Sequence, residues 1–117
     1  MNYRTTREFD KDYKRLAKRY RILDDDLALL KKVLDRFPLG TGKHFVVLHS
    51  TDAVKVVKAR FFCRSLKGSS LRIIYAYGDS GVEFIGIEFI EVYYKGDKPR
   101  EDRERIKSYL DSIRLSS

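Results

Sequence analysis

The sequence of 117 residues has a single cysteine, no long apolar stretch and no apolar leader. Because Cys63 has no second cysteine to pair with, an internal disulfide is excluded, and a lone thiol fits a reducing compartment. No apolar run approaches the ~20 residues that span a bilayer. The first residues, Met1–Thr5, do not resemble a secretory signal. We therefore expect a cytoplasmic protein without membrane association.

Acidic residues are scarce in the middle of the chain. The sequence carries 25 Lys and Arg against 17 Asp and Glu, which gives a formal net charge of +8. Residues 37–81 contain two acidic side chains, Asp52 and Asp79, and these basic ones: Lys43, Lys55, Lys58, Arg60, Arg64, Lys67 and Arg72. A surface of this kind attracts polyanions, of which nucleic acid is the commonest. Solubility is the alternative explanation of the charge.

Apolar spacing in the first third predicts two helices that form an antiparallel hairpin. The first helix begins near Thr6, and the second covers about 23–37 and ends at Pro38. The residues at helical spacing are Phe9, Tyr13, Leu16 and Tyr20, then Leu23, Leu27, Leu30, Leu34 and Phe37. Residues 2–6 fit a short strand before this hairpin.

The remainder predicts strands followed by one helix. Residues 38–53 read as a loop in which 45–48 fits a short strand. Period-two alternation and turn signals predict strands at 56–64, 71–77 and 82–94, and a closing helix runs from about Pro99 to Arg114. The predicted order is β-α-α-β-β-β-α in one domain, 1–117. We expect an α+β fold in which the helical hairpin covers one face of a small antiparallel sheet.

Basic side chains on these strands are expected to meet on the uncovered face. A four-residue turn at 78–81 pairs Tyr77 with Val82 and places Arg72 opposite Ile87, on one face with Phe89. A one-residue slip in the preceding hairpin is needed to bring Arg72 to the face of the other cations. The expected cluster is Lys58, Arg60, Arg64, Arg72, Tyr93 and Lys95. Clustered like charges repel each other and favour an anionic ligand such as phosphate. The alternative is that Glu83, Glu88 and Glu91 neutralise them.

Several segments resemble the RelE/ParE superfamily of toxins. Residues 9–16 are similar to its first helix, 58–68 and 71–77 to its central hairpin, and 90–98 to its last strand. The resemblance implies a toxin of a toxin–antitoxin pair, with a cognate antitoxin as its partner. RelE-like members cleave messenger RNA on the ribosome, whereas ParE-like members inhibit DNA gyrase without cleaving. By position, Lys58, Arg60 and Arg72 resemble the basic residues of the RelE-like site, and Lys95 stands near a position that is arginine there.

The candidate residues suit RNA cleavage by the substrate's own 2′-hydroxyl, without a metal or another cofactor. Such cleavage needs a base, cations for the phosphorane and an acid for the leaving oxygen. We assign phosphate stabilisation to Arg60 and Arg72, the base to Lys58, and base stacking to Tyr93. Lys95 is the candidate acid or a further phosphate contact. The candidate RNA-binding residues are Lys55, Arg64 and Lys67. His44 and His49 have no metal-ligand spacing and are interpreted as ordinary loop histidines.

Three functions remain open at this point. The first is a metal-independent endoribonuclease that depends on the ribosome. The second is a non-catalytic inhibitor of gyrase, and the third is a degenerate toxin that only binds its antitoxin.

Overall fold

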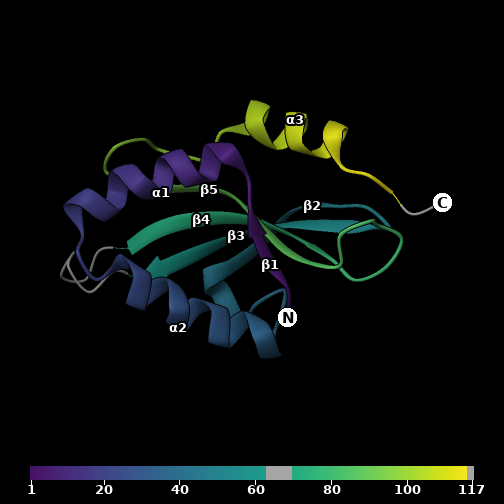
Figure 1. The fold of residues 1–117 in the computed structure, drawn as a ribbon, viewed down its shortest axis with the longest axis horizontal. Helices are drawn as coiled ribbons and strands as arrows, with labels where there is room; N and C mark the ends of the chain where they lie inside the picture. Colours follow the sequence, from purple (N-terminus) through teal and green to yellow (C-terminus); the bar gives the residue numbers. More distant parts are fainter. Residues whose placement is uncertain (63–69, 116–117) are drawn as a thin grey trace.

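The computed structural model describes residues 1–62 and 70–115, and these form the α+β fold that the sequence predicts (Figure 1). The elements in chain order are β1 (Tyr3–Thr5), α1 (Arg7–Arg19), α2 (Leu23–Arg36), the 3-10 turn η1 (Gly42–His44), β2 (Phe45–Ser50), β3 (Val54–Phe62), β4 (Ser70–Gly78), β5 (Gly86–Tyr94) and α3 (Arg103–Ser112). No helix in 1–62 or 70–115 is long and apolar enough to cross a membrane.

The sheet has five strands in the order β1-β5-β4-β3-β2. It is mixed rather than wholly antiparallel as predicted, because β1 runs parallel to β5 and pairs Tyr3 with Ile87. A parallel pair needs a long connection, and here the whole of the chain from α1 to β4 supplies it. Residues 38–53 were expected to be a loop with a short strand at 45–48, and this strand is β2. It pairs with β3 and adds one strand to the predicted order.

The α1–α2 hairpin covers one face of the sheet, and its start is set by a local cap. The Thr6 hydroxyl accepts a hydrogen bond from the Phe9 amide at 3.1 Å, and Glu8 and Asp10 lie in the first turn, where the helix dipole favours acids. Phe9 packs on Phe89 of β5 with ring centroids 5.4 Å apart. Burying a side chain of this size contributes about 1.5–3 kcal/mol.

A second, smaller core joins α3 to the other face of the sheet. Ile106 of α3 packs with Val56, Ile74 and Ile90 of the central strands. Figure 1 shows α3 and α2 on opposite sides of the sheet, with α3 near the C-terminal end of the chain. This face also carries the basic residues of the candidate site.

The β4–β5 register differs from the predicted one. Arg72 pairs with Tyr93, not with Ile87, because β5 starts at Gly86 instead of Val82 and Gly78 pairs with Gly86. The intervening residue Val82 forms a bridge to Leu115 instead. A bulge between Ile74 and Tyr75 then moves Phe89 to the helical face, so its predicted place beside Arg72 is wrong.

The β3–β4 pairing brings Arg60 and Arg72 to the same face, as predicted. The offset is larger than one residue, since Phe62 pairs with Ser70. Arg60 is the direct partner of Arg72 in this register. The shift beyond the expected one-residue slip is an even number of residues. Such a shift changes the partner of each residue but keeps its side chain on the same face.

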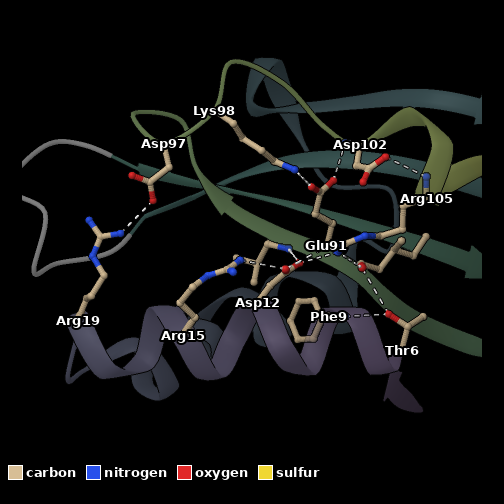
Figure 2. Close-up of polar contacts among 12 residues, drawn as sticks. Thr6, Phe9, Asp12, Arg15, Arg19, Glu91, Asp97, Lys98, Asp102 and Arg105 are labelled. Carbon is tan, nitrogen blue, oxygen red and sulfur yellow. Dashed lines mark hydrogen bonds and ion pairs between the residues drawn. The ribbon is translucent and has the colours of Figure 1, made fainter.

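Buried ion pairs connect α1, β5 and α3 (Figure 2). Asp12 of α1 accepts from the Arg105 guanidinium at 2.6 Å and from the Val92 amide at 3.3 Å. Glu91 of β5 accepts from the Lys98 ammonium and from the Asp102 amide, the latter at 2.9 Å. Because each buried charge has several donors or acceptors, the network fixes where α3 begins.

Candidate nucleic-acid interface

Arg60, Arg72 and Tyr93 form one row across β3, β4 and β5. Arg60 pairs with Arg72, and Arg72 pairs with Tyr93, so the three side chains leave the same face of the sheet. Side chains of directly opposed residues lie about 5 Å apart at their β-carbons. Lys58 lies two residues before Arg60 on the same face of β3. The structure therefore brings together four of the predicted site residues.

A hollow of about 350 Å³ lies beside this row. Its lining residues are Lys43, His44, Val46, Lys58, Arg60 and Arg72. The turn η1 and the start of β2 form one wall, and β3 and β4 provide the rest. A hollow of this size, lined by cations and one imidazole, suits an anionic group such as a phosphodiester.

Among the cations of the cluster that the structure describes, Arg72 is the most enclosed, with 9 % of its surface exposed. Burial lowers its pKa from the ordinary value, and the neighbouring charge of Arg60 lowers it further, while Tyr93 acts in the opposite direction. An anion placed between the two guanidinium groups would relieve this repulsion. Planar guanidinium donors also suit the two oxygens of a phosphate.

Lys58 forms an ion pair that sequence reasoning missed. Its ammonium donates to the Glu101 carboxylate at 2.9 Å, and the two side chains are 27 % and 8 % exposed. Burial raises the pKa of Glu101, but the hydrogen bonds from Lys58 and from its own amide, with the charges of Lys58 and Arg103, lower it overall. In this geometry Lys58 is a hydrogen-bond donor, which does not match the predicted role of a base.

Neutralisation of the cluster by glutamates, the alternative to an anionic ligand, involves a different residue from Glu88 and Glu91. Glu91 pairs with Lys98, and Glu88 pairs with the exposed Arg4 at 3.0 Å, so neither is bound to the cluster in these contacts. Glu101, in the segment before α3, neutralises Lys58 instead. Glu101 lies 43 residues from Lys58 in the sequence, so the tertiary fold is what brings the two together.

Tyr93 offers little surface for stacking on a base. It is 5 % exposed, and the Lys98 ammonium lies 5.0 Å from its ring centroid. Burial, followed by the charges of Glu101 and Glu91, raises the pKa of Tyr93 to about 12, against the opposing effect of Arg72. Its buried hydroxyl has no hydrogen-bond partner among the atoms that the structure describes. Neither the ring face nor the hydroxyl of Tyr93 is open to a ligand in this conformation.

The other predicted residues do not join this cluster in the described structure. Lys95 is exposed in the turn after β5 and is not among the residues that line the hollow. Lys55 alternates with Val54 and Val56, which face α3, so it leaves the opposite face, and its ammonium donates to the Ser50 hydroxyl at 3.0 Å. Arg64 and Lys67, like Cys63, lie outside the described residues.

His44 is the residue at this site whose place was not anticipated. It ends η1, directly before Phe45, and Phe45 pairs with Ala59. His44 therefore stands directly before the paired part of β2 and lines the same hollow as Arg60. A hairpin between 45–48 and 56–64 would have indicated this neighbourhood, but the optional strand was not paired with any other in the prediction.

No protein-family model matches the chain, and neither the curated proteins nor the solved structures include a significant match. Within residues 1–62 and 70–115, no group of three or more His, Cys, Asp or Glu side chains is placed to hold a metal ion. The cations that line the hollow can donate hydrogen bonds to a phosphodiester. The imidazole that lines it with them can accept and release a proton.

Proposed function

We propose that this protein is the toxin of a toxin–antitoxin pair, a RelE-like endoribonuclease that cleaves messenger RNA on the ribosome in the cytoplasm. The observation that carries the proposal is the direct pairing of Arg60 with Arg72 beside a hollow that Lys58 and His44 also line. The resemblance of residues 9–16, 58–68, 71–77 and 90–98 to such toxins supports the same function.

The substrate would place one phosphodiester in the hollow. Arg60 and Arg72 would each donate to its non-bridging oxygens and stabilise the additional negative charge of the phosphorane. Lys58, held by Glu101, would add positive charge near these oxygens without a direct contact to them. Attack by the 2′-oxygen on phosphorus breaks the bond to the 5′-oxygen and leaves a 2′,3′-cyclic phosphate. Specificity for RNA follows because DNA has no 2′-hydroxyl.

A cleavage assay on ribosomes programmed with messenger RNA tests this function. Wild-type protein should cut within the decoded codon, and a 2′-deoxy substitution at that position should abolish the cut. Arg60→Ala should lower the cleavage rate about 10²–10³-fold, and Arg72→Lys, which keeps the charge but loses the planar donors, should also lower it. Arg36→Ala is the matched control, because Arg36 is exposed at the end of α2 on the opposite side of the sheet. Wild-type cleavage by both site variants would refute the assignment.

A second candidate function is binding without cleavage, as in a gyrase inhibitor or a toxin that only binds its antitoxin. Two observations favour it: Lys58 is occupied by Glu101, and Lys95 lies outside the lining of the hollow. Inhibition of gyrase supercoiling by protein that leaves messenger RNA intact would support the inhibitor. Normal growth after induction of the gene would support a degenerate toxin that only binds its antitoxin.

The proposed partners follow from the charge of the site. An antitoxin whose acidic segment covers Arg60 and Arg72 would compete with RNA for the same cations. Such competition would explain inhibition by simple occlusion. Co-purification with the product of a neighbouring small gene is the direct measurement.

A further inference from the structure

We infer that His44 is the general base that takes the proton from the 2′-hydroxyl, an inference that rests on the proposed endoribonuclease function. The imidazole ends η1 at the edge of the hollow and lines it together with Arg60 and Arg72. It is half-buried, and its ring meets the ring of Phe62 edge to face, with centroids 5.7 Å apart. This contact orients the imidazole, and the next residue, Phe45, begins the pairing with β3 opposite Ala59.

The groups of the predicted cluster near the hollow are unsuited to accept a proton. The guanidinium groups of Arg60 and Arg72 do not act as bases at neutral pH. Lys58 already donates to Glu101 at 2.9 Å. The Tyr93 hydroxyl is a poor source of tyrosinate at pH 7, because burial and nearby carboxylates raise its pKa to about 12. An imidazole changes its charge between pH 5 and 8 and so serves as a base in this range.

The groups that face His44 come from three elements. Lys43 adjoins it in η1, Lys58 and Arg60 face the hollow from β3, and Arg72 faces it from β4. Glu101 lies behind Lys58 as its partner. A phosphate bound by Arg60 and Arg72 would therefore present the adjacent ribose to the wall that His44 forms.

The proposed step is balanced in atoms and protons. A ring nitrogen of His44 removes the proton of the 2′-hydroxyl, and the 2′-oxygen forms a bond to phosphorus. The bond from phosphorus to the 5′-oxygen breaks, and that oxygen takes a proton from solvent. The imidazolium returns its proton to solvent, so nothing is oxidised or consumed.

The test measures single-turnover cleavage by His44→Gln, with His49→Gln as the matched control. His49 is an exposed histidine on β2, five residues further along the chain. We expect His44→Gln to lower the rate about 10²–10⁴-fold, which is the usual contribution of a general base, while His49→Gln keeps the wild-type rate. Affinity for an uncleavable 2′-deoxy analogue on the ribosome should stay within a few-fold for both variants.

Two further readouts separate proton transfer from a structural role. The acidic limb of the wild-type pH–rate profile should disappear in His44→Gln, and added imidazole should partly restore cleavage by His44→Ala. Melting curves for both variants show whether the fold is intact. Loss of affinity in parallel with rate, or an unchanged pH profile, would overturn the role of His44 and leave the endoribonuclease function standing. Absence of cleavage by wild-type protein would overturn both.

Discussion

Replacing Glu101 with glutamine removes the ion pair that holds Lys58. The substitution therefore tests both how much this pair stabilises the fold and whether Lys58 can then bind a ligand. The substitution removes a carboxylate that accepts from Lys58 at 2.9 Å and lies 4.0 Å from Arg103. Breaking a fully buried pair costs about 3–5 kcal/mol, and exposed pairs contribute up to about 1 kcal/mol. Glu101 is 8 % exposed but Lys58 is 27 % exposed, so water compensates part of the loss. We expect the free energy of unfolding to fall by about 1–3 kcal/mol.

This loss of stability has a defined dependence on pH. The pKa of Glu101 in the folded protein lies below its ordinary value of 4.5, through the opposing effects of burial and of the bond from Lys58. Its stabilising contribution is therefore complete above the unfolded pKa and disappears as the pH falls through the folded one. Thermal melts should show the largest difference between wild type and Glu101→Gln above about pH 5, and the difference should close at lower pH.

The same substitution should strengthen RNA binding. Lys58 loses its acidic partner and becomes available to a phosphate, so the slope of log affinity against log salt should steepen by about 0.7, the value for one additional contact to a single strand. Fluorescence anisotropy with a labelled single-stranded RNA measures this slope. Glu104→Gln, on the exposed side of α3, removes the same charge as a control. A destabilised Glu101→Gln with an unchanged slope would show that Lys58 does not face the RNA.

Two further substitutions test the ion pair of Asp12 with Arg105 and the contribution of Tyr93 to the site. Asp12→Asn leaves the half-buried Arg105 without its carboxylate at 2.6 Å, and we expect chemical denaturation to show a loss of about 2–4 kcal/mol. A loss no larger than that of Asp10→Asn, an exposed neighbour in α1, would contradict the buried pairing. Tyr93→Phe removes a buried hydroxyl that has no partner among the described residues, so stability should change by less than about 1 kcal/mol. If this hydroxyl donates to the phosphate, cleavage falls while the melting temperature holds; a fall in both would assign Tyr93 to the core.

Periodicity accounts for most of the fold that could be predicted. The 4-3-4 spacing from Phe9 and from Leu23 gave both helices within a residue or two, and period-two alternation gave β3 and β4. The pairing register of the strands is harder to predict from the sequence. Alternation of apolar and polar residues shows which face each side chain occupies, but not which residue of the neighbouring strand lies opposite it. The β4–β5 register was wrong for this reason: Val82 fits a strand by composition, yet it bridges to Leu115.

The candidate site was predicted in part for similar reasons. Arg60, Arg72, Lys58 and Tyr93 share a face because their strands alternate, and alternation is visible in the sequence. The partner of Lys58 was not visible, since only tertiary structure places Glu101 beside it. His44 was missed because its place depends on how β2 pairs with β3.

The pairing of β1 with β5 also bears on the order in which the molecule is assembled. Tyr3 lies beside Ile87, and Phe9 packs on Phe89, so the first residues meet their partners only after most of the chain has been synthesised. Contacts between segments so far apart slow the search for the native topology. A nascent chain therefore emerges with its first strand unpaired, and closure of the sheet follows release of the last strand.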